Sequence, residues 1–282
     1  MEMKDILITA DFDCTLTDKQ GNIPPKNLEA IAYFMAQGGS FTVNTGRSAP
    51  MAAKLLKKVP VNAPLLVCNG SVMWEDGKAV ETVEMDLPLE ETMAALCQRF
   101  PNMNVEVQGL DAHYNFQSKG CWKEYCISQG TPFLSAKPGM QYGPFVKFAL
   151  YGYAHKSSMH DLLYEGTAEE VAEMDAAEQW LLKTYGDKLT VLRCGKRTIN
   201  VHAAGVSKLA AARRLQEKLG KKILICIGDA MNDVQMLDGA DYAYAPADGA
   251  IADRYEQVCA CAEGAVAEVI YKKIPEILAN QP

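Results

Sequence analysis

The sequence predicts an α/β protein in which a Rossmann-like parallel sheet, covered by helices on both faces, is interrupted by an inserted α+β cap. Two different patterns of apolar and polar residues along the chain support this prediction. Continuous apolar strands alternate with amphipathic helices over residues 5–70, and the same pattern returns after residue 208. Between these segments the strands mix apolar with polar residues, which is typical of antiparallel sheets that are buried on one face.

The N-terminal segment predicts three strands joined by two helices. The strands are the apolar runs at residues 5–13, 40–47 and 63–70. Apolar residues recur at helical spacing over residues 24–39, before a Gly-Gly stop, and over residues 48–59. Strands and helices in this order indicate a parallel sheet.

The middle segment predicts two helices, at residues 87–100 and 167–186. The strands expected there are residues 103–108, 112–117, 144–153, 188–194 and 197–203. The segment that follows predicts helices at residues 209–220, 232–240 and 265–278 and strands at residues 221–229, 242–246 and 257–262. We therefore expect residues 1–80 and 199–282 to form a discontinuous core domain and residues 81–198 to form the cap domain.

Composition limits the function. The chain has 282 residues, 49% of them hydrophobic, and a formal net charge of -7, which argues against a general nucleic-acid binder. No signal-peptide pattern precedes the first strand, and no apolar run approaches the roughly 20 residues of a membrane span. The nine cysteines and four histidines show no CxxC pair and no spacing that suits zinc. We expect a cytoplasmic protein, monomeric or homodimeric, that binds a small molecule and neither nucleic acid nor membrane.

Residues that follow the apolar strands are the candidates for chemistry, because ligands bind parallel sheets at the carboxyl ends of the strands. Four short stretches, "DFD", "NTGR", "GVSK" and "GDAMND", occupy such places or begin a helix. They supply Asp11, Asp13, Thr45, Lys208, Asp229, Asn232 and Asp233.

Charge repulsion among these acids indicates that the site binds a cation. Asp11 and Asp13 project to the same side of a strand about 6 to 7 Å apart, so a cluster with Asp229 needs a cation. Carboxylate oxygens suit Mg²⁺, whereas the hydroxyl of Thr45 and the ammonium of Lys208 suit phosphate oxygens. One carboxylate can attack phosphorus while a second moves the proton, so the set predicts a phosphoryl-transfer site.

The motif order resembles the haloacid dehalogenase (HAD) superfamily of phosphohydrolases. The chain carries D-x-D-x-T-L, a Thr after the second strand, a Lys, and then G-D-x-x-N-D, in that order, so the resemblance covers the whole chain. The long insert, together with "TGR", "CNG" and "EGAVAEVI", is similar to the Cof-type subfamily with the C2B cap.

The resemblance implies Mg²⁺ as the cofactor and a role for each matching residue. Asp11 would be the nucleophile and a metal ligand, and Asp13 the general acid and base, bound to the metal through its main-chain carbonyl. Thr45 and Lys208 would hold the phosphoryl group. Asp229 would ligate Mg²⁺ directly.

Further residues have supporting roles in the resemblance. Asn232 would lie at the phosphate or its water, and Asp233 would contact the metal or Lys208. Thr15 would support the nucleophile loop by hydrogen bonding. Gly46 and Arg47 are candidates for binding phosphate or substrate, although Arg47 could equally pair with an acid on the surface.

The chain departs from the family at Cys14, where the family usually has glycine. A glycine allows close backbone packing, so the cysteine could tighten or re-aim the loop. The acids and Thr15 are intact, so we expect activity to survive.

These inferences lead to a Mg²⁺-dependent phosphatase that acts on a small phosphorylated metabolite, a sugar phosphate in the first instance. A phosphomutase that returns phosphate to a sugar would use the same site. A signalling switch phosphorylated on Asp11 is a third possibility, but a switch needs a long-lived acyl phosphate, and the acid/base at Asp13 argues against it.

Overall fold

The structure, a computed structural model, describes residues 1–280, and within them all side chains except those of residues 53–56, 160 and 164. The chain folds into two compact units. The first unit comprises residues 1–46, residues 55–80 and the chain from Ser207 onwards, and the second comprises residues 47–54 and 81–206.

The first unit is built on a five-stranded parallel sheet. Its strands are β1 (Ile6–Ala10), β2 (Ser40–Val43), β12 (Ile223–Ile227), β13 (Tyr242–Pro246) and β14 (Glu256–Val258). Their order is β14-β13-β12-β1-β2, with Leu7 opposite both Leu224 and Ser40. Every residue of β1, β2 and β12 is buried, because helices cover both faces of a parallel sheet.

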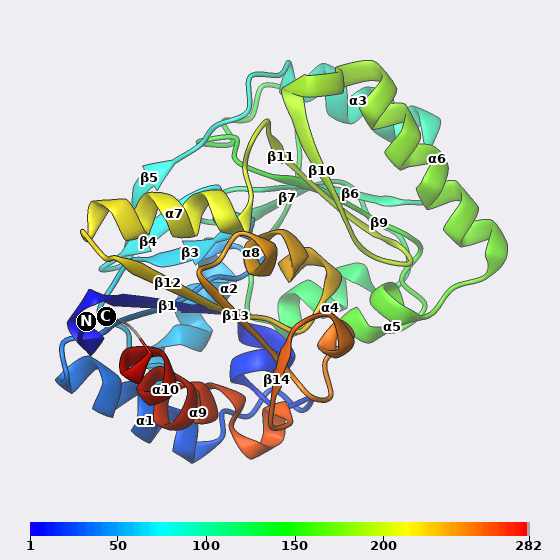
Figure 1. Cartoon of the computed structure of the whole chain (residues 1–282). Helices are drawn as coiled ribbons and strands as arrows, with labels where there is room; N and C mark the ends of the chain where they lie inside the picture. Colours follow the sequence, from blue (N-terminus) through cyan, green and yellow to red (C-terminus); the bar gives the residue numbers. More distant parts are fainter. Residues whose placement is uncertain (281–282) are drawn as a thin grey trace. The chain divides into compact units, whose positions relative to one another are not determined.

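Five helices belong to the unit that contains this sheet. They are α1 (Pro25–Ala36), α7 (Lys208–Lys218), α8 (Val234–Asp238), α9 (Ala265–Glu268) and α10 (Ile274–Ala279). Helices α7 and α8 pack Leu215 and Met236 against Leu7 of β1. Helices α1, α9 and α10 lie on the opposite face of the sheet (Figure 1), where the side chain of Asn27 accepts a hydrogen bond from the amide of Ala267.

A small antiparallel sheet extends the first unit beyond β2. It consists of β3 (Leu65–Val67), β4 (Val72–Glu75) and β5 (Lys78–Thr82) in that order. A parallel bridge between Asn44 and Leu66 connects β3 to the end of β2. The tight turn between β4 and β5 places Asp76 and Gly77 at φ values of 50° and 79°, as a two-residue hairpin turn requires.

The second unit has a six-stranded sheet with helices on both faces. Its strands are β6 (Asn104–Gln108), β7 (His113–Gln117), β8 (Phe133–Ser135), β9 (Phe148–Tyr151), β10 (Leu189–Gly195) and β11 (Thr198–Ala203). The order is β10-β11-β9-β6-β7-β8, and all neighbours are antiparallel except β7 and β8. Its helices are α2 (Ala49–Leu55), α3 (Leu89–Arg99), α4 (Trp122–Ser128), α5 (Met159–Tyr164) and α6 (Ala168–Tyr185).

Side chains along the strands of this unit alternate between the two faces of the sheet. Val105 and Val107 of β6 join the apolar core under α3 and α6. Ala149 and Tyr151 of β9 face the other way and pack with Trp122 of α4. Figure 1 shows α3 and α6 on one side of this sheet and α4 and α5 on the other.

The structure confirms the predicted α/β fold with a parallel-sheet core, but several elements differ. The strand expected at residues 257–262 ends at Val258, so this prediction was wrong beyond it, because Asp248 accepts a hydrogen bond from the amide of Cys261 and turns the chain. The predicted boundary between residues 198 and 199 falls inside β11, which pairs with β9 and β10 of the second unit. That unit accordingly extends to Val206. Of the helices in residues 1–280, none combines the length and the apolar character that crossing a membrane requires.

Candidate functional site

The carboxyl ends of β1 and β12 bring two distant acidic stretches together. These strands are neighbours, with Ala10 opposite Ile227, and the amide of Asp11 continues the ladder by donating to the carbonyl of Ile227 at 2.9 Å. Asp11 and Asp229 therefore lie at the same edge of the sheet. This edge is the usual place for a ligand in an open parallel sheet.

The loop after β1 is a tight turn held by its own threonines. Thr17 donates both its amide and its hydroxyl to the carbonyl of Phe12, at 3.0 and 3.1 Å. The amide of Cys14 donates to the Thr17 hydroxyl at 3.2 Å. Cys14 itself has a φ of 58°, a left-handed conformation that glycine adopts readily and other residues adopt at a cost of about 1–2 kcal/mol. The glycine that the resemblance implies at this position would avoid this cost.

Lys208 is placed by the start of α7. Ser207 caps this helix by accepting from the amide of Ala210, and the side-chain amide of Asn44 donates to the carbonyl of Lys208 at 2.9 Å. The buried ammonium of Lys208 then reaches two carboxylates. Its Nζ lies 2.5 Å from Oδ1 of Asp11 and 2.6 Å from Oδ1 of Asp233.

The loop after β12 is shaped by Asp233. Its Oδ2 accepts from the amides of Asp229 and Ala230, both at 3.2 Å, while its Oδ1 accepts from Lys208. A Cβ atom on Gly228 would lie 2.6 Å from the Asp233 side chain, so this close approach requires glycine. Asp229 is held from the opposite loop, because the hydroxyl of Thr15 donates to its Oδ1 at 2.9 Å.

Three buried carboxylates and one lysine make this an electrostatically unusual site. Burial raises the pKa of Asp11 well above its ordinary value, and the neighbouring Asp233 and Asp229 add to the effect, although Lys208 opposes it. Burial, together with the charge of Asp233, also raises the pKa of Asp229 to about 7. Burial alone would lower the pKa of Lys208, yet Asp11 and Asp233 outweigh it and hold the lysine charged. The site therefore holds one charged lysine among several acids, whose mutual repulsion opposes the ionisation of all of them at once.

The donor set fits a hard divalent cation. Asp11, Asp229 and Asp233 each place an oxygen within 4.8 Å of the other two. Both oxygens of Asp233 already accept hydrogen bonds, so Asp11 and Asp229 are better placed to hold the cation. Oxygen ligands at this density suit Mg²⁺, which also relieves the repulsion among the carboxylates. The side chain of Asp13 is not in this group and is exposed to solvent.

The remaining predicted site residues lie at three places. Thr45 is buried two residues beyond β2, where its amide donates to Leu66. A Cβ atom on the adjacent Gly46 would lie 2.9 Å from Oδ1 of Asn69. Asn232 is half-buried in the short helical turn that precedes α8.

Arg47 belongs to the second unit. There it contacts Gln129, with 3.5 Å between Nη1 and Oε1.

One positioning residue was absent from the predicted set. Asn44 is fully buried and fixes the backbone of Lys208. A polar residue directly after an apolar strand is a signal that could have identified it, since such residues face the ligand edge.

Sequence relatives are distant. The 5-amino-6-(5-phospho-D-ribitylamino)uracil phosphatase YcsE of Bacillus subtilis is 22% identical over 237 residues, which cover 83% of this chain and 80% of that protein. A protein of Arabidopsis thaliana named chloroplastic endoribonuclease YBEY is 22% identical over 264 residues. The match covers 86% of this chain but only 41% of the Arabidopsis protein's length.

Solved structures share the fold. The HAD subclass IIB sugar phosphatase BT4131 aligns with a TM-score of 0.72 and 16% identity, over 96% of this chain and 99% of its own. The family model for haloacid dehalogenase-like hydrolases matches residues 8–252, which include Asp11, Lys208 and Asp229. This match spans most of the chain and confirms the resemblance found in the sequence, so the protein belongs to the haloacid dehalogenase-like hydrolases.

Proposed function

We propose that the chain is a Mg²⁺-dependent phosphatase that hydrolyses a small phosphorylated metabolite of the sugar phosphate class. The observation that supports this proposal most directly is the buried lysine of the site. Lys208 lies 2.5 Å from Asp11, so a carboxylate suited to attack phosphorus adjoins a cation suited to hold phosphoryl oxygens.

Asp11 is the proposed nucleophile. Lys208 lies beside its Oδ1. One oxygen of the carboxylate would attack phosphorus and form an aspartyl phosphate, and the other would contribute to holding Mg²⁺. The bond from phosphorus to the leaving oxygen breaks as the new bond forms. Lys208 would offset the negative charge on the transferring group, the dominant requirement of phosphoryl transfer.

Asp13 is the proposed general acid and base. Its side chain is exposed to solvent, unlike those of the buried acids nearby. It would give a proton to the leaving oxygen and then take one from the water that hydrolyses the aspartyl phosphate. Free phosphate leaves, and Asp11 is regenerated.

The other acids bind the metal or position their neighbours. Asp11, Asp229 and the main-chain carbonyl of Asp13 are the proposed ligands of Mg²⁺, which would supply charge neutralisation when bound. Asp233 has both carboxylate oxygens engaged, so we assign it to positioning Lys208 and the loop after β12.

The roles of Thr45, Gly46, Arg47 and Asn232 in binding phosphate or substrate stay predictions. The names of two relatives support the substrate class. YcsE is named as the phosphatase of a phosphoribitylamino compound, and BT4131 as a sugar phosphatase.

The test is phosphate release from a panel of phosphorylated metabolites, with and without Mg²⁺. We expect turnover only with the metal, and a loss of at least about 10³-fold in kcat/KM for Asp11→Asn. Asp18→Asn is the matched control, because Asp18 lies in the same loop but bonds to the turn of residues 20–22. Full turnover by Asp11→Asn would contradict the mechanism. An isomerised sugar phosphate in place of free phosphate would identify a mutase, and an aspartyl phosphate that outlives seconds would favour a switch.

A further inference from the structure

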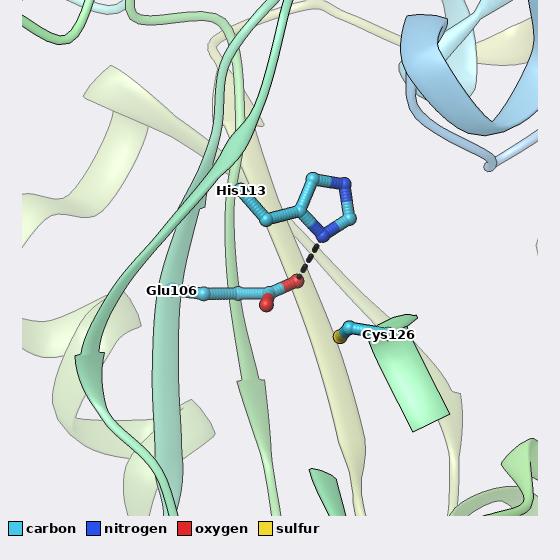
Figure 2. Close-up of side chains that lie close together, drawn as sticks. All are labelled: Glu106, His113 and Cys126. Atoms are coloured by element: carbon cyan, nitrogen blue, oxygen red, sulfur yellow. Dashed lines mark ion pairs between the residues drawn. The ribbon is translucent and has the colours of Figure 1, made fainter. Parts of the chain in front are cut away.

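The second unit contains a buried cluster of three chemically different side chains. Glu106 lies on β6, His113 on β7 and Cys126 on α4, and each is at most 2% exposed. Figure 2 shows the three side chains pointing toward one another. One potential ligand atom from each, a carboxylate oxygen, a ring nitrogen and a sulfur, lies within 4.8 Å of the other two.

The sheet and α4 create this juxtaposition. Glu106 alternates with Val105 and Val107, so it points away from the apolar core under α3 and α6. The antiparallel pairing of β6 with β7 places His113 opposite Gln108, two residues from Glu106 and on the same face. Helix α4 covers that face and contributes Cys126.

Neighbouring side chains fix the orientation of the carboxylate and the imidazole. Trp122 Nε1 donates to one oxygen of Glu106 at 3.0 Å, and Gln108 Nε2 donates to the other at 2.7 Å. The hydroxyl of Ser48 lies 2.7 Å from Nε2 of His113. A metal-bound histidine donates its other ring N–H to an acceptor that fixes the ring, and the Ser48 hydroxyl is placed to accept from Nε2.

The cluster leaves buried polar atoms unsatisfied. Among residues 1–280 as described, Nδ1 of His113 has no hydrogen-bond partner, although it lies 3.3 Å from Oε1 of Glu106. Oε1 of Gln108 and the hydroxyl of Thr131 also lack partners. All three residues line a cavity of about 20 Å³, which is enough for one water molecule. If Nε2 donates to Ser48, two lone pairs face each other across 3.3 Å, and a cation between them would remove the repulsion.

We propose that Glu106, His113 and Cys126 form a binding site for a divalent transition metal, with Zn²⁺ as the best match to their mixed ligand set. Zinc combines thiolate, imidazole and carboxylate ligands, and three protein ligands leave a fourth position for water. The cavity beside Gln108 and Thr131 would hold that water.

The distances agree with tetrahedral coordination. Bonds of about 2.0–2.1 Å to nitrogen and oxygen give an edge of about 3.3 Å between these two ligands. This is the separation between His113 and Glu106. The sulfur, with a bond of about 2.3 Å, needs a separation of about 3.6 Å from the other two ligand atoms. These separations are now at most 4.8 Å, so the Cys126 sulfur moves by about 1.2 Å or less on binding.

Charge balance also favours the metal. Gln108 and Trp122 each donate a hydrogen bond to Glu106, and both bonds favour the charged carboxylate. Burial, with the Glu106 charge nearby, raises the pKa of the Cys126 thiol. The thiol therefore loses its proton to solvent when the sulfur–metal bond forms, and one dication neutralises the two anions.

The test uses Co²⁺ as a spectroscopic replacement for Zn²⁺ in the full chain. The protein is stripped with chelator and titrated with Co²⁺ in excess Mg²⁺, which occupies oxygen-only sites. We expect one Co²⁺ per chain with a thiolate-to-cobalt charge-transfer band in the near ultraviolet, and loss of that band when Zn²⁺ is added.

Variants locate the sulfur. Cys126→Ser should lose the band, and Cys14→Ser, the control beside the first carboxylate cluster, should keep it. A wild-type protein that remains folded but develops no band would overturn the proposal and leave Glu106 and His113 as a buried ion pair. A band that survives in Cys126→Ser would overturn it equally. Neither result depends on phosphatase activity.

Discussion

Replacing Lys208 with methionine should expose the electrostatic cost of the acidic site. Lys208→Met keeps the length of the side chain but leaves two buried carboxylates, Asp11 and Asp233, without the cation that lies 2.5 and 2.6 Å from them. Breaking a buried ion pair in this way costs about 3–5 kcal/mol of unfolding free energy. We expect that loss at pH 7.5 in the absence of Mg²⁺.

The size of the loss should depend on pH with a definite sign. A buried carboxylate without its cation loses its charge by binding a proton. Lowering the pH from 7.5 to 5.5 makes this protonation more favourable by about 2.7 kcal/mol, at about 1.36 kcal/mol per pH unit. The loss at pH 5.5 should therefore shrink to about 2 kcal/mol or less.

Urea unfolding followed by circular dichroism at both pH values measures these differences. Lys218→Met is the control, because Lys218 is exposed at the end of the same helix and should change stability by about 0.5 kcal/mol or less. Equal losses for Lys208→Met at the two pH values would refute the electrostatic reasoning. So would a loss no larger than that of the control.

Three further predictions concern stability, each measured by urea unfolding. Gly70→Ala should lower the free energy of unfolding by about 2–4 kcal/mol, because Gly70 has a φ of 93° and a Cβ would lie 2.5 Å from the carbonyl oxygen of Ser207. Gly77→Ala, the control, has a positive φ but open space around the Cβ, so it should cost only about 1–2 kcal/mol. Equal costs for the two variants would contradict the steric contribution. Burial, aided by Lys147, lowers the pKa of His202 well below 6.5, so at this residue only the unfolded chain gains a proton as pH falls. This residue's contribution to stability should fall by about 1.4 kcal/mol from pH 7.5 to 5.5, so the stability of wild type relative to His202→Gln should fall by that amount, and an unchanged difference would contradict the assignment. Cys14→Gly should stabilise the protein by up to about 1 kcal/mol, because glycine relieves the left-handed strain at φ 58° at some entropic cost, and a net loss would contradict this account.

Most of the parallel sheet could be predicted because its strands are buried on both faces and therefore apolar throughout. The same logic located Asp11 and Asp229, since the carboxyl ends of adjacent parallel strands meet whatever the sequence distance. The hairpin of β4 and β5 was missed. Its Asp76-Gly77 pair is a recognised two-residue turn signal, so that information was present in the sequence.

The cluster of Glu106, His113 and Cys126 could not be predicted from spacing. Its ligand atoms come from two strands and a helix, and their approach depends on how α4 packs against the sheet. Sequence spacing reports a metal site only when one turn or one helix carries the ligands. The statement that no cysteine or histidine spacing suits zinc concerns the sequence alone and carries no information about this tertiary contact.

The position of Cys14 has a consequence for the chemical reactivity of the site. A partly exposed thiol next to the proposed nucleophile is an obvious target for alkylating agents and peroxide. Burial, reinforced by Asp229 and Asp13, raises the pKa of Cys14 to about 12. Only on the order of one thiol in 10⁴ to 10⁵ is then ionised at neutral pH, and the thiolate is the reactive form. Burial, with the acids at this edge of the sheet, therefore protects the sulfur of Cys14 from modification.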